Sequence, residues 1–321
     1  FLGSDTDDYT YEALKLFLLG AISRAFKPGC KFEVMLCLVG GQGAGKSSFF
    51  RLLAVNDDWF SDDLKKLDDE NVYRKMQGHW IIEMSEMIAT ANAKSIEEIK
   101  SFLSRQKETY KIPYETHPAD RKRQCVFGGS SNTLDFLPLD RTGNRRFVPV
   151  MVYPERAEVH ILEDEQASRE YINQMWAEAM EIYRSGNFRL RFSPAMNDYL
   201  KAHQKDFMPE DTKAGQILDY LERYSGSMVC SKQLYKEALG HDYDEPKQWE
   251  LREINDIMNN AVTGWRAFSN PRYFPEPYRR QKGWERIRND NEPDNSMDGF
   301  QEIPTEEMEQ LGLPEEWLKQ K

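Results

Sequence analysis

At 321 residues, the chain is long enough for two domains, or for one large domain with an appendage. Hydrophobic residues make up 40% of the sequence and aromatic residues 12%, which is enough for packed cores and excludes disorder throughout the chain. Lysine and arginine number 43 against 54 aspartate and glutamate residues, so the net charge is -11. This balance excludes a protein coated in nucleic acid, and any nucleic-acid contact must come from local basic patches.

The sequence shows no membrane or secretion signal. Its longest apolar stretches, such as residues 34–39, are far shorter than the roughly 18 residues that a membrane helix needs, and residues 1–25 have no basic segment leading into an apolar one. The four cysteines form no CxxC pair, and the five histidines have no metal-binding spacing. We therefore expect a cytoplasmic protein with no membrane partner.

The first half of the chain alternates helical and strand-like patterns. A helix is expected over residues 9–26, followed by a buried strand at 34–39 and a helix at 46–54. Further strands are expected at 80–84 and 125–128 and in a run ending at Val150, with a helix over 95–106. This alternation predicts an α/β fold with substantial parallel pairing, and we assign residues 1–190 to this domain.

The second half is mostly helical. Residues 155–186 are expected to be largely helical, and residues 191–213 to form a helical linker. Helices are then expected at 214–224, 231–239 and 246–261, followed by two aromatic, basic segments. Three short helices and a hairpin are typical of a winged helix, so a winged-helix-like domain is predicted over 214–288. Residues 289–321 are expected to be an acidic flexible tail.

A phosphate-binding motif directly follows the first strand. Gly40-Gly41-Gln42-Gly43-Ala44-Gly45-Lys46-Ser47 is a full match to the Walker A pattern between a strand and a helix, and Ser48 follows it. Glycines let the backbone curl around phosphate oxygens, with main-chain amides pointing at the anion. Lys46 is expected to reach the β- and γ-phosphates of ATP, and Ser47 to hold Mg²⁺.

Polar residues at the ends of the next two strands are candidates for catalysis. We assign Glu83 to the Mg²⁺ shell and Glu86 to activation of the attacking water, although the two roles could be exchanged. Asn132 follows the strand at 125–128 and is our candidate sensor of the γ-phosphate. The alternative is that Glu86 only caps a helix and that Asn132 is an ordinary turn residue.

Two adjacent arginines precede the run to Val150. Because neighbouring side chains on a strand face opposite ways, one of Arg145 and Arg146 could reach the nucleotide of an adjacent subunit while the other packs locally. An arginine supplied in this way accelerates phosphoryl transfer roughly 10³- to 10⁵-fold. Salt bridges at the surface are the alternative.

Two segments combine cations with aromatic residues, as single-stranded DNA sites do. Residues 105–123 have basic side chains around Tyr110 and Tyr114, and residues 278–286 would form the wing of the second domain. The candidate DNA-binding residues are Arg105, Lys107, Lys111, Arg121, Lys122, Arg123, Arg279, Arg280 and Lys282. Glu250, Glu253 and Asp256 on the third helix of that domain would repel DNA, so it could instead bind protein or dock only through its wing.

Taken together, these segments resemble the virulence-associated protein E family, P-loop ATPases of phages and mobile islands that are related to superfamily 3 helicases and viral primase-helicases. The resemblance runs from about Asp5 to Arg288. Its most specific marks are the Walker A segment, Trp80-Ile81-Ile82-Glu83-Met84-Ser85-Glu86, Ser104-Arg105-Gln106 with Pro113-Tyr114, and Thr142-Gly143-Asn144-Arg145-Arg146-Phe147. Ser130-Ser131 stands where a family member would often have threonine, and no primase domain is visible.

The resemblance implies a P-loop NTPase core of the AAA+ group with ATP and Mg²⁺ as cofactors. It also implies a homo-oligomeric ring, with a hexamer expected, that acts on single-stranded or forked DNA and works with a primase or another replication protein. We therefore expect a Mg²⁺-dependent ATPase that serves as a replicative helicase or DNA-remodelling motor of a phage or mobile element. The alternatives are a nucleotide-gated module that binds DNA or protein without unwinding and, less favoured, a small-molecule P-loop kinase.

Overall fold

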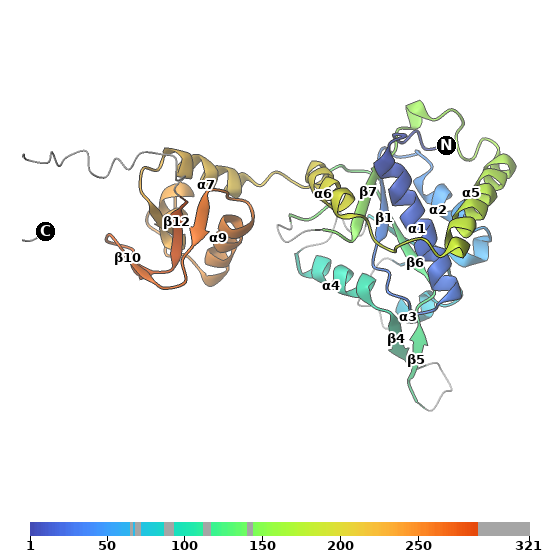
Figure 1. Ribbon diagram of the computed structural model, residues 1–321, viewed down its shortest axis with the longest axis horizontal. Coiled ribbons are helices and arrows are strands. Elements are labelled where there is room, and N and C mark those ends of the chain that lie inside the picture. Colours follow the sequence, from blue (N-terminus) through green and yellow to red (C-terminus); the bar gives the residue numbers. More distant parts are fainter. Residues whose placement is uncertain (65–66, 68–71, 87–92, 112–116, 140–143, 288–321) are drawn as a thin grey trace, which may run out of the picture. The chain divides into compact units, whose positions relative to one another are not determined.

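The computed structural model describes residues 1–64, 67, 72–86, 93–111, 117–139 and 144–287. The chain forms two compact units, Phe1–Thr212 and Lys213–Lys321 (Figure 1). The first unit is built around a parallel sheet, and the second combines short helices with antiparallel strands. None of the helices in the described ranges is long and apolar enough to cross a membrane.

The described part of the first unit contains a sheet of five parallel strands. They are β1 (Met35–Val39), β2 (Phe60–Ser61), β3 (Ile81–Ser85), β6 (Val126–Ser131) and β7 (Phe147–Met151). Their order across the sheet is β2-β3-β6-β1-β7. Every residue of β1 is buried, as expected for an apolar strand with neighbours on both sides and helices on both faces. The prediction of an α/β fold with parallel pairing is confirmed.

The strand register brings three chain segments to one edge of the sheet. Val39 at the end of β1 is paired with Ser131 of β6, and Ser85 at the end of β3 is paired with Ser130. The loops that follow β1, β3 and β6 therefore start from the same edge, which we call the carboxyl edge. The segments that precede these strands lie at the opposite, amino edge.

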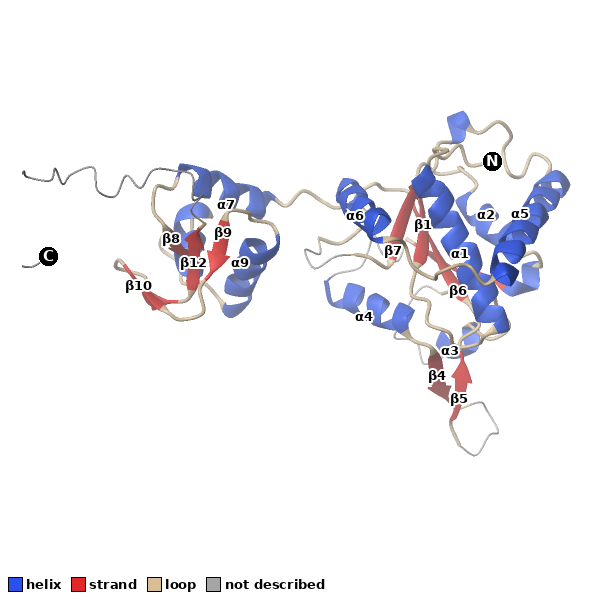
Figure 2. Cartoon of the chain, in the orientation of Figure 1, coloured by secondary structure: helices blue, strands red, loops and turns tan. Residues whose placement is uncertain are grey.

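Helices cover both faces of this sheet (Figure 2). On one face, α1 (Asp8–Phe26), α2 (Lys46–Leu53) and α5 (Glu165–Ser185) share a buried cluster with Leu36 and Leu38 of β1. On the other, α4 (Ala93–Ser104) packs with Met35 and Cys37. This division follows from the alternation of side chains along a strand. The smaller elements are η1 (Asp57–Trp59), α3 (Val72–Lys75), η2 (Pro154–Arg156) and an antiparallel hairpin of β4 (Lys107–Tyr110) and β5 (Ala119–Lys122).

The expected linker at 191–213 belongs largely to the first unit, which corrects that prediction. It forms α6 (Pro194–His203) and η3 (Gln204–Phe207), and Leu200 and Phe207 are both buried within the clusters of the first unit. Gln204 Nε2 also donates to the backbone oxygens of Asn144 and Phe147. Apolar residues at helical spacing thus dock this segment on the sheet, and the boundary between the units follows Thr212.

The second unit is built from short helices and two small antiparallel sheets. Its elements are α7 (Thr212–Arg223), β8 (Met228–Cys230), α8 (Ser231–Gln233), η4 (Leu234–Ala238), α9 (Gln248–Asn260), β9 (Trp265–Ala267), β10 (Arg272–Phe274), β11 (Arg279–Gln281) and β12 (Gly283–Arg286). One sheet has the order β8-β12-β9, and β10 pairs with β11. Trp284 is buried in the core and donates from Nε1 to Asn259 Oδ1. The winged-helix assignment stays a prediction, and residues 289–321 lie outside the described ranges.

Gly128 of β6 lies where the sheet packs closely on α2. A Cβ atom at this position would lie 2.3–2.7 Å from ring carbons of Phe50, which is fully buried. We expect Gly128→Ala to lower the free energy of unfolding of the first unit by about 1–3 kcal/mol, because neither the ring nor the strand can move aside. Chemical denaturation followed by circular dichroism would measure this change.

Gly215 provides the control, because it lies inside α7 and a Cβ there meets nothing within 4 Å. Gly215→Ala should leave the first unit unchanged and stabilise the second by about 0.5–1 kcal/mol. An unfolding transition of Gly128→Ala that coincides with that of the wild type would show that the packing argument is wrong.

Candidate nucleotide site at the carboxyl edge

A glycine-rich loop, Gly40–Gly45, connects β1 to α2 at the carboxyl edge. Gly43 and Gly45 have φ values of 82° and 78°, in the left-handed region that residues with a Cβ atom rarely adopt. A Cβ atom on Gly45 would also lie 2.7 Å from Ile161 Cγ2. Among the described residues, no side chain caps the first turn of α2. The backbone of this loop therefore requires glycine at positions 43 and 45, and the loop leads directly into α2.

Lys46 ties this loop to β6. Its side chain is nearly buried, and Nζ donates to Gly40 O and Gly41 O at 2.7 Å and to Asn132 Oδ1 at 2.8 Å. Burial lowers the pKa of the Lys46 ammonium group below its ordinary value, and the carboxylates of Glu86 and Glu83 oppose part of that change. The structure thus brings Lys46 and Asn132 together, as the sequence predicted.

Glu83 lies at the centre of the site. It is fully buried, and its Oε1 accepts from Ser47 Oγ at 2.8 Å and from Ser130 Oγ at 2.5 Å. Glu83 Oε2 is also buried and has no hydrogen-bond partner among the described residues. A buried carboxylate oxygen without a donor is costly unless a cation or an ordered water meets it. The hydroxyl of Ser47 and the carboxylate of Glu83 are oxygen ligands of the kind that Mg²⁺ prefers, so these residues fit that ion.

Glu86 and Asn132 lie next to each other beyond the strand ends. Glu86 has φ 53°, its N–H donates to Ser130 O, and its Oε1 accepts from the backbone N–H of Asn132 at 3.0 Å. Glu86 is half-buried and Asn132 is exposed. Each of them is therefore closer to solvent than Glu83, which favours Glu83 rather than Glu86 for the cation.

The remaining residues of the loop differ in exposure. Gly41, Gln42, Gly43 and Ser47 are exposed, whereas Ser48 is only partly exposed and Ala44 is buried within the core. The side chain of Ala44 therefore serves packing, and only its backbone could face a ligand.

His160 contacts the loop, although no sequence pattern marks it as a site residue. Its Nε2 lies 3.2 Å from Gly43 O, and its Nδ1 accepts from the backbone N–H of Leu162 at 3.2 Å. This pair of contacts assigns the ring proton to Nε2, which then donates to Gly43 O. His160 has no partner at a recognisable sequence spacing, so only the fold could place it beside the loop.

Arg145 and Arg146 lie at the other edge of the sheet. Both precede β7 and interact with Glu33, which precedes β1. Since β1 has five residues, the two edges are about 16 Å apart, too far for either arginine to reach the loop of its own chain. Arg145 keeps 64% of its side chain exposed, whereas Arg146 is largely buried and donates to Ser104 Oγ.

The candidate DNA-binding residues of the hairpin have different environments. Arg105 lies beside Tyr73 and Glu108, Lys107 pairs with Asp120, and Arg121 lies over the ring of Tyr110. Lys111 and Lys122 are exposed. Residues 112–116, including Pro113 and Tyr114, lie outside the described ranges, as do Thr142 and Gly143.

Arg123 corrects one of these predictions. Only 1% of its side chain is exposed, since it forms a buried ion pair with Glu108 and donates to Phe102 O at 2.6 Å. Its guanidinium group lies over the aromatic rings of Phe102 and Phe127, in the core beneath the hairpin. A buried guanidinium needs partners of this kind, so Arg123 anchors the hairpin and is not available to DNA.

In the second unit, the predicted basic residues are all at the surface. Arg279 pairs with Glu276 at 3.1 Å, and Arg280 and Lys282 are exposed on and beside β11. The carboxylates of α9 are used within the unit: Glu253 pairs with Lys213, and Glu250 accepts from the backbone N–H of Lys247.

Comparison with known proteins identifies the family. The apo structure of the NrS-1 C-terminal region (305–718) is 14% identical, with a TM-score of 0.48 over 88% of this chain and 73% of that one. The A form apo structure of the same region is also 14% identical, with a TM-score of 0.49 over 88% and 72%. A search of curated proteins finds no match. The model of the virulence-associated protein E-like domain matches residues 1–209, and the chain therefore belongs to the virulence-associated protein E-like family.

Proposed function

We propose that this protein is a Mg²⁺-dependent ATPase that acts on DNA as a replicative helicase or remodelling motor of a phage or mobile element. One observation carries the proposal: Lys46, Ser47, Glu83 and Asn132 come from three separate segments and are joined by hydrogen bonds at one edge of a parallel sheet. Membership of the virulence-associated protein E-like family supports it. The proposal includes a P-loop NTPase core, a winged-helix second unit, a cytoplasmic location and cooperation with a primase or another replication protein.

Each residue of the site has a role in this proposal. The main-chain amides of the loop and the Lys46 ammonium group bind the triphosphate, and Ser47 with Glu83 holds Mg²⁺. When bound, Mg²⁺ would supply positive charge that offsets charge on the phosphates. Glu86 and Asn132, which hydrogen-bond to each other, would orient the attacking water beside the terminal phosphate. Lys46 must then exchange its present carbonyl partners for phosphate oxygens.

The position of the arginines favours an assembly with shared sites. Neither arginine can serve the loop of its own chain, and Arg145 is exposed at the opposite edge of the sheet. In a head-to-tail ring, that edge of one subunit can face the loop of the next. We therefore assign the arginine that acts between subunits to Arg145, with Arg146 holding it in place through their shared partner Glu33.

Lys46→Ala should abolish ATP hydrolysis while the protein remains folded, because the side chain provides the charge that meets the phosphates. The ATPase rate with and without single-stranded DNA would be measured for this variant, for the wild type and for Lys201→Ala, an exposed lysine of α6. Only Lys46→Ala should lose turnover. Unchanged turnover in that variant would overturn the proposal. A phosphorylated small molecule formed without DNA would favour a P-loop kinase. Nucleotide binding with no turnover in the wild type would favour a nucleotide-gated module that binds DNA or protein.

The lowered pKa of Lys46 predicts the pH dependence of nucleotide affinity. Below this pKa the ammonium group is charged and attracts the triphosphate; as pH rises through it, the charge and the affinity are lost. We expect the nucleotide affinity of the wild type to begin to decline at a pH below that at which a lysine with an ordinary pKa would lose its charge. Lys46→Arg keeps its charge and should show no such decline. A fluorescent ATP analogue titrated between about pH 7 and pH 10 would test this, and identical profiles would refute it.

Arg145→Ala should retain nucleotide affinity but lose roughly 10³-fold or more in ATPase rate. Mixing it with Lys46→Ala should restore activity, because some interfaces then combine an intact lysine from one subunit with an intact arginine from the other. Mixing experiments with Arg146→Ala would show whether that residue acts in the same way. If mixed assemblies stay inactive, and light scattering shows that they form, shared sites would be contradicted.

A further inference from the structure

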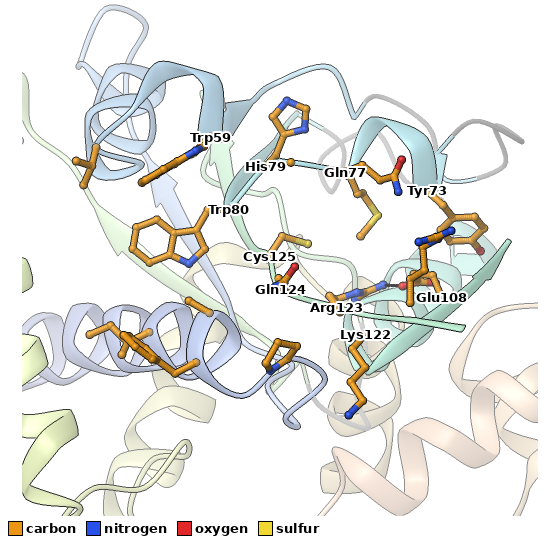
Figure 3. A pocket seen from close by; sticks show the side chains of 18 of the residues that line it. Trp59, Tyr73, Gln77, His79, Trp80, Glu108, Lys122, Arg123, Gln124 and Cys125 are labelled. Carbon is orange, nitrogen blue, oxygen red and sulfur yellow. Dashed lines mark hydrogen bonds and ion pairs between the residues drawn. The ribbon is translucent and has the colours of Figure 1, made fainter. Parts of the chain in front are cut away.

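A pocket of about 950 Å³ lies at the amino edge of the first unit (Figure 3). Its walls come from the end of α1, from η1 and α3, from the β4–β5 hairpin and from α5. Trp80 directly precedes β3, and Gln124 and Cys125 precede β6. The proposed hydrolysis takes place at the carboxyl edge and makes no use of this pocket.

A rigid group of tryptophans forms one end of the pocket. Trp80 stacks on Trp176 with ring centroids 4.6 Å apart, and Trp59 meets Trp80 edge-on at 6.5 Å. The two inner rings are fixed by hydrogen bonds from Nε1 to backbone oxygens, those of Ala21 and Leu53. Trp59 keeps 45% of its surface exposed. Phe26 is 63% exposed on the wall formed by α1. Planar apolar surface is thus held in place and left open to solvent.

The other end of the pocket is basic. Lys122 and Pro28 line both this pocket and a neighbouring hollow of about 360 Å³, whose wall also contains Lys27 and Lys107. The two carboxylates in these walls are already paired, Glu108 with Arg123 and Asp120 with Lys107. Lys27 and Lys122 are exposed, and no ion pair with another described residue is seen for either. In a chain with a net charge of -11, this pocket and the adjoining hollow have five cations against two carboxylates.

We infer that the pocket binds a single-stranded segment of nucleic acid. Its bases stack on Trp59 and Phe26, and its phosphates lie beside Lys122 and Lys27 where the two hollows join. Proteins bind single strands through exposed aromatic rings next to basic side chains, and stacking of this kind tolerates any base sequence. A purely apolar peptide would leave the lysines unused, and a basic one would be repelled by them. The inference rests on the proposed action on DNA and names where the strand lies.

Fluorescence anisotropy of labelled oligothymidylate, titrated with the full chain, tests the inference. Trp59→Ala should raise the Kd about 5- to 150-fold, since one stacked base is lost, and Trp59→Phe should fall between it and the wild type. Phe26→Ala should also raise the Kd and provides an independent variant at a more exposed ring. Tyr171→Ala removes an exposed ring of α5 that does not line the pocket, and should bind like the wild type.

The salt dependence of binding gives a readout that a loss of packing would not change. For single strands, the slope of log affinity against log salt concentration changes by about 0.7 for each phosphate contact. Lys122→Gln should therefore have a slope smaller by about 0.7, and Lys27→Gln likewise, whereas Lys201→Gln should keep the wild-type slope.

The proposed function and the pocket for nucleic acid can be refuted separately. If the wild type neither hydrolyses ATP nor binds DNA, the proposed function is wrong and the inference falls with it. If the wild type binds DNA while Trp59→Ala, Phe26→Ala and Lys122→Gln bind equally well, only the pocket inference is wrong. Variants that keep DNA affinity but lose self-association, measured by light scattering, would show that a second copy of the chain occupies the pocket.

Discussion

The hydrogen bonds to the buried carboxylate of Glu83 are the interaction on which the site depends. Ser47 belongs to the start of α2, Ser130 to β6 and Glu83 to β3, so a single oxygen atom joins three segments that are distant in sequence. The second oxygen is buried without a partner among the described residues. Such an arrangement costs free energy in isolation. A bound cation would offset this cost, because it would supply the missing partner of the buried oxygen. The hydrogen bond between Lys46 and Asn132 lies at the same edge of the sheet.

Because the strands are parallel, the two edges of the sheet hold different sets of functional residues. Main-chain amides, Lys46 and Glu83 gather at the carboxyl edge, where ligands of open parallel sheets commonly bind. The amino edge holds Arg145 and the aromatic pocket instead. In our proposal, nucleotide and nucleic acid are therefore held at opposite edges of one rigid sheet, and a neighbouring copy brings the two kinds of edge together.

Sequence patterns predicted the architecture of the first unit well, because apolar strands bounded by glycine and amphipathic helices are local features. They placed Lys46, Ser47, Glu83 and Asn132 in one site because parallel strand ends must share an edge. They failed for Arg123, whose charge favoured the surface until Glu108 and two phenylalanine rings enclosed it. They also missed His160, and they predicted a linker over residues 191–213 although Leu200 and Phe207 are buried in the clusters of the first unit.

The sequence by itself determined the loop and its glycines, the order of strands and helices along the chain, and the residue types available for phosphate and metal chemistry. These depend on backbone preferences and on spacing within a few residues. Only the tertiary structure decided which charged groups are buried, that Arg145 and the loop lie at different edges, and that Trp59, Phe26 and Lys122 share one pocket. Such facts depend on contacts between residues far apart in the chain, and no local pattern records which distant side chain will neutralise a charge or cover a ring.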